Sequence, residues 1–139
     1  MSIELDEATL GKRVTRGPAL YYASAMPSEG LKAVLGIVHG FADHGARYRH
    51  VMGALAEHGI GSIAIDLRGH GRALGTRGYC NDFAEFLDDA RELRRLVDER
   101  AKGVPTFLFG HSFGGLIAAS SVVVDAGDLR GLVLSAPFF

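Results

Sequence analysis

The sequence predicts an α/β fold, with one mostly parallel β-sheet and helices on both of its faces. Short apolar runs alternate with helical stretches along the 139 residues. The apolar runs are hydrophobic throughout and do not alternate with polar residues, which is typical of strands buried on both faces. Hydrophobic residues make up 47% of the chain and charged residues 22%, so one ordinary domain has enough apolar material for a core.

The first strands are expected near the N-terminus, where residues 1–16 form an edge segment. "GKRVTRG" (11–17) is interpreted as an edge strand, and "PALYYASAMP" (18–27) as a second strand that Pro27 and the turn-like "SEG" close. "AVLGIVHG" (33–40) is a short apolar run and predicts a buried strand.

The segment from His44 to His58 predicts a helix, and Gly59 is its natural C-terminal stop. Its apolar residues recur at helical spacing. They are Tyr48, Val51, Met52, Leu55 and Ala56. "GSIAIDLRG" (61–69) then predicts a buried strand that ends in charge at Asp66.

A second helix is expected from about Asp82 to Lys102. Asp82 with Glu85 three residues later resembles a capping box, and Gly103 with Pro105 ends the helix. The apolar residues all share one helical face. They are Phe83, Phe86, Leu87, Ala90, Leu93, Leu96 and Val97.

Two strands and one helix follow. "TFLFG" (106–110) and "GLVLSAP" (131–137) predict strands, and "FGGLIAASSVVV" (113–124) predicts a helix between them. This helix is apolar on nearly all sides, so we expect it to be buried.

The central motif is Gly110-His111-Ser112-Phe113-Gly114, which has the form G-x-S-x-G. Taken alone the pattern is weak, but here it joins an expected strand to an expected helix, which is the context of a nucleophilic serine on a sharp turn. Glycines are needed because neighbours with side chains would collide there. An ordinary alternative is that Ser112 only caps the helix, since serine is a preferred N-cap residue.

His39-Gly40-Phe41 follows the strand 33–40, and a parallel sheet would place it beside the serine turn. An acyl-transfer site needs two amides aimed at the oxyanion. We expect these to be the backbone N–H groups of Phe41 and Phe113.

Four blocks resemble the α/β-hydrolases of the monoacylglycerol lipase and lysophospholipase group. They are "HGFADHGARY" (39–48), "DLRGHGRA" (66–73), "GYCNDFAEFLDDA" (78–90) and "GHSFGG" (110–115). Family members carry similar blocks in this order and at similar spacing, and the resemblance runs from about residue 17 onward.

The resemblance implies Ser112 as nucleophile and the amides of Phe41 and Phe113 as oxyanion donors. Ala73 departs from the family, which usually has serine there, but that loop is not catalytic. In the family, a lid follows the strand that "GLVLSAP" resembles, and the acidic and histidine members of the triad come after two further strands. The resemblance therefore implies that residues 1–139 are the N-terminal part of one hydrolase domain and that a C-terminal half supplies the base.

The chain's own histidines leave a second possibility open, namely a local substitute base. Hydrogen bonds that hold loops are the better default for each of them. They are His39, His44, His50, His58, His70 and His111. No H-E-x-x-H or C-x-x-C spacing occurs, so we expect no metal and no cofactor.

Two functional hypotheses result. The first is a serine esterase or lipase that cleaves carboxylic esters of apolar acyl chains once its C-terminal half is present. The second is a catalytically poor half-domain that folds by self-association or by pairing with a complementary fragment, because its last strand leaves an open sheet edge.

Further expectations concern partners and location. The net charge of −1 argues against a nucleic-acid partner, and the acidic start "MSIELDEATL" lacks a secretory signal, so we expect a cytoplasmic protein. The lid of the family would allow transient contact with a membrane surface.

Overall fold

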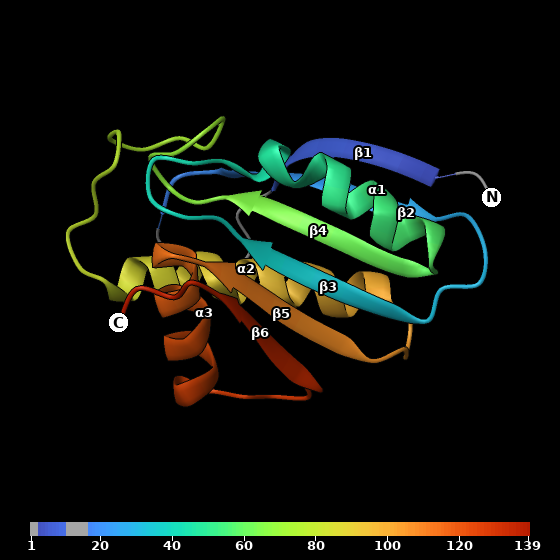
Figure 1. The fold of residues 1–139 in the computed structure, drawn as a ribbon. Coiled ribbons are helices and arrows are strands. Elements are labelled where there is room, and N and C mark those ends of the chain that lie inside the picture. The colour runs from blue at the N-terminus through green and yellow to red at the C-terminus, as the bar shows by residue number, and fades with distance from the viewer. Residues whose placement is uncertain (1–2, 11–16) are drawn as a thin grey trace.

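A computed structural model describes residues 3–10 and 17–139, and Figure 1 shows their arrangement. The strands are β1 (Ile3–Leu10), β2 (Leu20–Pro27), β3 (Ala33–Val38), β4 (Ile60–Asp66), β5 (Thr106–His111) and β6 (Gly131–Ser135). The helices are the short 3-10 helix η1 (Gly45–Tyr48), α1 (Arg49–Glu57), α2 (Ala84–Ala101) and α3 (Phe113–Val124).

The strands form one six-stranded sheet in the order β1-β2-β4-β3-β5-β6. The neighbours β4, β3, β5 and β6 are parallel, whereas β1 and β2 add an antiparallel edge. Each parallel pair requires a crossover, which α1, α2 and α3 provide in turn. The expected mostly parallel sheet is confirmed.

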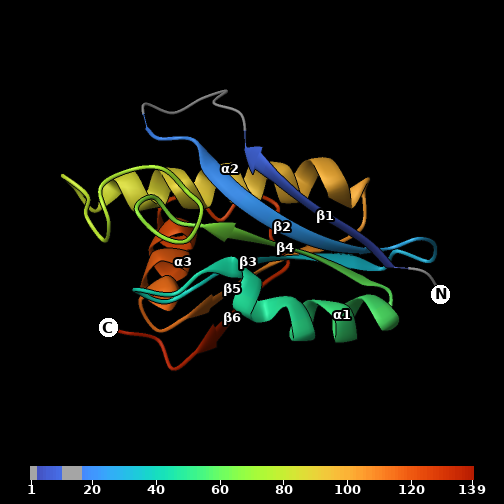
Figure 2. The ribbon, with the colours of Figure 1, turned by 90° about the horizontal axis from the view of Figure 1, so that it is seen from above.

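Helices cover both faces of the sheet, as Figure 2 shows, with α1 on one side and α2 on the other. The larger core lies between the sheet and the helices α2 and α3, and a smaller core lies under α1. Fully buried side chains on β3, such as Val34 and Ile37, contribute to the two cores on opposite faces because successive strand residues point to opposite sides.

Two expectations at the ends of the chain need correction. The segment 1–16, expected at the sheet edge, contains the edge strand Ile3–Leu10, which lies earlier in the chain than the edge strand that we expected; it pairs with β2 through the backbone, and an edge strand does not need an apolar sequence. Most of the edge strand expected at 11–17 lies outside the described residues.

The α3 helix, which we expected to be buried, is buried only on the face toward α2 and the sheet. Val123 and Val124 at its end are 87% and 65% exposed.

The expected limits of α2 are largely confirmed. Lys102 and Gly103 after its end have φ angles of 51° and 91°, a left-handed stop. At its start the Asp82 carboxylate accepts a hydrogen bond from the Ala84 amide at 2.7 Å, while Glu85 accepts one from the Asn81 amide at 2.9 Å. Both side chains cap this end, although not in the reciprocal pairing of a capping box.

No helix in the described part of the chain has both the length and the apolar character needed to cross a bilayer.

A buried ion pair ties the loop after β4 to α2. The Arg68 guanidinium donates to Asp89 from Nε and Nη2 at 3.1 and 2.8 Å, and the Arg68 backbone amide donates to the same carboxylate at 2.9 Å. The two side chains are only 5% and 2% exposed. Glu85 lies 3.4 Å from the same guanidinium. This pair fixes the loop because breaking it would leave a buried charge without a partner.

The Asp89→Asn substitution should lower the free energy of unfolding by about 3 kcal/mol or more, since it leaves the Arg68 charge buried and poorly compensated. The matched control is Asp88→Asn, because Asp88 pairs with Arg91 at the exposed helix surface; this change should cost about 0.5 kcal/mol at most. Urea denaturation followed by circular dichroism measures both. Equal midpoints for the two variants would contradict the role given to Asp89.

Candidate active site

Ser112 occupies the sharp turn between β5 and α3. Its φ and ψ angles are 52° and −121°, a strained conformation for a residue with a side chain. Neighbouring backbone stabilises it, because the Ser112 amide donates to the Ser135 carbonyl at 3.0 Å and the Ser112 carbonyl accepts from the amides of Gly115 and Phe138 at 2.9 and 3.0 Å. The turn is therefore fixed from α3 on one side and from the segment around β6 on the other.

The Ser112 hydroxyl does not cap α3, since its side chain makes no cap hydrogen bond. The ordinary alternative for this serine, a side-chain N-cap, is wrong for this geometry. The side chain is half-buried, and its hydroxyl is left for another partner.

Glycines on either side of Ser112 allow the helix to approach the strands. A Cβ atom on Gly110 would lie 2.3 Å from the Gly114 carbonyl oxygen, and one on Gly114 would lie 2.3 Å from the carbonyl oxygens of both Val38 and His39. Real Cβ atoms do not come this close to backbone oxygen. Both glycines of the motif are thus required by the contact between α3 and the ends of β3 and β5.

The same contact brings the loop after β3 beside Ser112. A Cβ atom on Gly40 would lie 3.4 Å from the Cβ of Ser112. The aromatic rings of Phe41 and Phe113 meet edge to face with their centroids 6.0 Å apart. The structure therefore places the three residues singled out by the sequence, Ser112, Phe41 and Phe113, next to one another.

Two backbone amides at this position are available to a ligand. Among the turn, loop and cap hydrogen bonds of the described residues, none has the Phe41 or the Phe113 amide as its donor. Phe113 is the first residue of α3, where the N–H groups point out of the helix and the helix dipole favours negative charge. The arrangement can stabilise an oxyanion that forms on a carbonyl next to Ser112.

Asp66, at the end of β4, positions the Phe41 loop from the neighbouring strand. One carboxylate oxygen accepts from the Gly45 amide at 2.7 Å and the other accepts from the Arg72 amide at 2.8 Å. The carboxylate is 4% exposed, so its two backbone bonds replace the water it has lost. It thereby joins the loops that follow β3 and β4.

His39 lies under the same loop and is fully buried. Its Nδ1 is 2.7 Å from the Gly40 carbonyl, and its Nε2 accepts from the Leu67 amide at 3.0 Å. Burial lowers the pKa of this imidazole to about 4. The histidines were expected to hold loops by hydrogen bonds, and these two contacts confirm that role for His39.

Three further histidines form side-chain hydrogen bonds elsewhere. The Nδ1 of His111, next to Ser112 in sequence, lies 3.1 Å from the Ser135 hydroxyl. His58 and His70 bond to the carbonyls of Ala54 and Arg68. No hydrogen bond joins an imidazole of the described residues to the Ser112 hydroxyl.

The side chains around Ser112 are aromatic. Phe113 packs edge to face on Phe86 and also contacts Phe83, at centroid distances of 5.3 and 6.2 Å. Phe41, 58% exposed, covers His70 and borders an open cavity of about 450 Å³. The described residues contain no group of three or more potential metal ligands.

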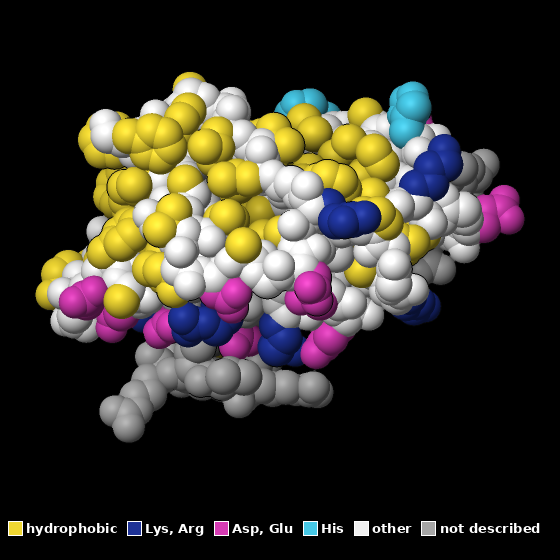
Figure 3. Space-filling view, turned by 90° about the horizontal axis from the view of Figure 1, so that it is seen from below, with side chains coloured by type: hydrophobic (Ala, Val, Ile, Leu, Met, Phe, Trp, Pro, Cys, Tyr) yellow, Lys and Arg dark blue, Asp and Glu magenta, His cyan; other side chains and the backbone are white. Residues whose placement is uncertain are grey.

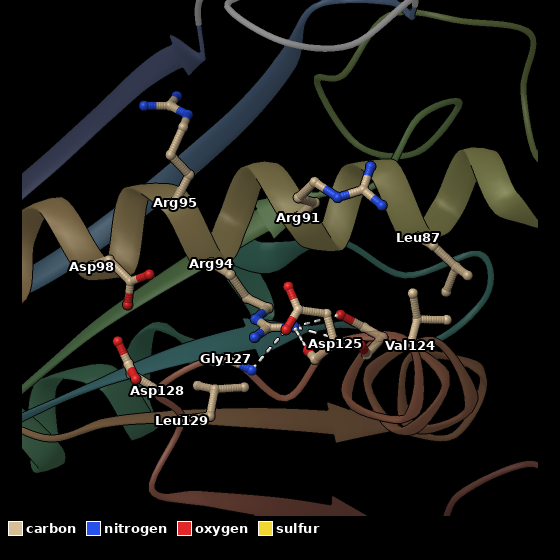
Figure 4. Close-up of a pocket in the computed structure, with 11 residues that line it drawn as sticks. Leu87, Arg91, Arg94, Arg95, Asp98, Val124, Asp125, Gly127, Asp128 and Leu129 are labelled. Carbon is tan, nitrogen blue, oxygen red and sulfur yellow. Dashed lines mark hydrogen bonds between the residues drawn. The ribbon is translucent and has the colours of Figure 1, made fainter.

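A second cavity of about 310 Å³ lies between α2, α3 and the loop that follows α3 (Figure 4). Arg94 points into it and donates to the backbone carbonyls of Asp125 and Ala126, where it caps the C-terminal end of α3. Neither Ser112 nor the Phe41 loop lines this cavity, so we assign Arg94 a structural role.

Comparison with known proteins matches these features to one family. The sequence profile of the serine aminopeptidase, S33, family matches residues 29–139. Monoacylglycerol lipase from Mycolicibacterium smegmatis is 33% identical over 121 residues, which are 87% of this chain and 43% of that protein. Human monoglyceride lipase is 31% identical over 87% of this chain and 40% of its own length.

Solved structures show the same fold. A thermostable carboxyl esterase from Bacillus coagulans superposes with a TM-score of 0.78 at 27% identity, over 96% of this chain and 44% of the esterase. Monoglyceride lipase from Saccharomyces cerevisiae, solved with a substrate analogue, gives 0.78 at 25% identity, over 99% and 45% of the two chains. The chain thus spans less than half the length of these relatives. It belongs to the serine aminopeptidase, S33, family and is an α/β-hydrolase of the monoacylglycerol lipase group.

Proposed function

We propose that this chain carries the nucleophile and the oxyanion hole of a serine hydrolase that cleaves carboxylic esters of apolar acyl chains. The observation that supports this most directly is the strained Ser112 beside two unpaired amides, those of Phe41 and Phe113. The aromatic surroundings favour an apolar acyl group, and the relatives named as lipases and esterases point to the same substrate class.

In the proposed reaction, the Ser112 oxygen attacks the ester carbonyl carbon while a base takes the hydroxyl proton. The carbonyl oxygen becomes an oxyanion that accepts hydrogen bonds from the Phe41 and Phe113 amides. Collapse of this intermediate releases the alcohol, which receives the proton, and leaves an acyl group on Ser112. Water, deprotonated by the same base, then attacks the acyl carbon; the bond from that carbon to the Ser112 oxygen breaks, the acid is released, and the base returns the proton to Ser112.

We infer that the base and its acidic partner come from a complementary C-terminal half, because the relatives are more than twice as long as the match and no described histidine bonds to Ser112. The alternative is a catalytically poor half-domain that associates with itself. A cytoplasmic location and transient contact of a lid with a membrane surface stay predictions.

An apolar surface next to β6 supports association with another polypeptide. Among residues 3–10 and 17–139, β6 pairs with β5 alone, which leaves its other edge open in the described sheet. Figure 3, seen from below, shows hydrophobic side chains gathered on the face where Figure 1 places β6 and α3. The exposed ones on these elements and in the segment after β6 are Val123, Val124, Val133, Phe138 and Phe139.

A fluorophosphonate probe should label Ser112 when the C-terminal half is present, because the activated hydroxyl attacks phosphorus as it would attack an ester. Labelling should disappear in Ser112→Ala and persist in Ser120→Ala, a matched change on the same helix. Mass spectrometry of the labelled peptide identifies the site. Labelling that persists in Ser112→Ala would contradict the assignment of Ser112 as the nucleophile.

The Phe41→Pro substitution should raise the activation free energy of ester hydrolysis by ~3 kcal/mol, which lowers kcat/KM about 10²-fold or more. The reason is that proline lacks the N–H that we assign to the oxyanion. Phe41→Leu keeps this amide and should keep most of the activity. The measurement is kcat/KM for p-nitrophenyl butyrate. Equal activity of both variants and the parent would remove this loop from the oxyanion hole.

The isolated chain should be a poor catalyst and should associate, either with its C-terminal half or with itself. Without a base, the oxyanion hole and binding alone leave a residual acceleration of ~10³–10⁴ over water. Size-exclusion chromatography with light scattering, paired with ester turnover, tests both points. A monomer that turns over ester at the rate of ordinary esterases would instead indicate a base among the chain's own histidines, which single alanine variants would locate.

A further inference from the structure

His39 is a buried polar side chain that bonds to the Gly40 carbonyl, directly before the proposed oxyanion amide, and the proposed reaction does not use it. It is fully buried at the end of β3. Both of its ring nitrogens contact backbone: Nδ1 is 2.7 Å from the carbonyl oxygen of Gly40, and Nε2 is 3.0 Å from the amide of Leu67.

These two contacts determine where the imidazole proton is. A carbonyl oxygen only accepts, so Nδ1 carries the hydrogen, and a backbone amide only donates, so Nε2 is bare. This is one neutral tautomer, and the lowered pKa of about 4 keeps it neutral at ordinary pH. Burial is the main cause of that shift; the Gly40 carbonyl, Asp66 and Asp43 oppose it, and His70 adds to it.

The Gly40 carbonyl belongs to the same peptide unit as the Phe41 amide. In a trans peptide the C=O and N–H bonds point in opposite directions, and the unit rotates as a rigid plane. Holding the Gly40 oxygen toward His39 therefore turns the Phe41 N–H the other way, out of the protein interior. The Asp43 amide also donates to the Gly40 oxygen, at 3.2 Å, so the plane is held from two sides.

The Leu67 contact fixes the imidazole itself. Leu67 directly follows β4 and is fully buried, so His39 is tied to the neighbouring strand as well as to its own loop. The ring also lies against that of His70, with centroids 5.3 Å apart. An imidazole held at both nitrogens transmits its orientation to the peptide that it bonds.

We propose that His39 is a positioning residue of the oxyanion hole, which aims the Phe41 amide by holding the Gly40 carbonyl. The proposal rests on the proposed ester hydrolysis, since it assigns the Phe41 amide to the oxyanion. His39 touches neither the substrate nor Ser112, and it transfers no proton in the reaction.

Two substitutions separate the two hydrogen bonds of His39. The side-chain amide of asparagine reaches about as far as Nδ1, so His39→Asn can still donate to the Gly40 carbonyl but loses the Leu67 contact. The side-chain amide of glutamine reaches about as far as Nε2, so His39→Gln can still accept from Leu67 but loses the Gly40 contact. Each variant loses one buried hydrogen bond, so we expect the two to have similar free energies of unfolding, which urea denaturation measures.

The measurement is kcat and KM for p-nitrophenyl butyrate, on protein that contains the C-terminal half. His39→Gln should lower kcat by about 10- to 100-fold with little change in KM, because misaiming one oxyanion donor acts on the transition state. His39→Asn should retain kcat within about threefold of the parent, a difference too small to reflect loss of an oxyanion donor. Equal kcat values for the two variants, or a greater loss in His39→Asn, would overturn the positioning role. A parent protein that hydrolyses no ester would instead overturn the proposed function on which this role rests.

Discussion

The first turn of α3 lies against the ends of β3 and β5 so closely that no side chain fits between them. A Cβ atom on Gly114 would lie 2.3 Å from two carbonyl oxygens of the β3 end, and one on Gly110 would meet the backbone of α3 at the same distance. This contact forces the chain to turn within one residue, which gives Ser112 its positive φ angle. It also brings the loop after β3 beside that residue. The strained serine and the neighbouring Phe41 amide are therefore two consequences of one steric constraint.

Buried polar groups hold the loops around this turn, in addition to the apolar packing of residues such as Leu67. Asp66 joins the loops after β3 and β4, His39 joins the same loops from beneath, and Arg68 with Asp89 fixes the second loop to α2. A buried polar group is costly unless it is paired, so each of these contacts has a narrow range of acceptable geometry. Such contacts suit the proposed oxyanion hole, in which two backbone amides would point at one small volume. Loops that rested on apolar contacts alone would tolerate more variation in that direction.

The sequence was sufficient to predict the parallel part of the sheet, all three α-helices and the meeting of Ser112, Phe41 and Phe113, because glycines and apolar runs reveal where strands end and turns begin. It placed the edge strand later in the chain than Ile3–Leu10, whose pairing with β2 depends on backbone contacts between distant segments. It also led us to expect a fully buried α3, although Val123 and Val124 are exposed. The two hydrogen bonds of His39 could not be read from the sequence, because one partner is a backbone amide 28 positions away. The only local signal was a histidine directly after an apolar strand and directly before a glycine.

The central claim is that Ser112 is a nucleophile and that the amides of Phe41 and Phe113 receive the oxyanion. A crystal structure of the protein after reaction with a fluorophosphonate tests this most directly, because the phosphonyl oxygen occupies the place of that oxyanion. We expect phosphorus bonded to the Ser112 oxygen, and the phosphonyl oxygen about 2.7–3.1 Å from both amide nitrogens. Phosphorus on another residue, or a phosphonyl oxygen that contacts neither amide, would contradict the account.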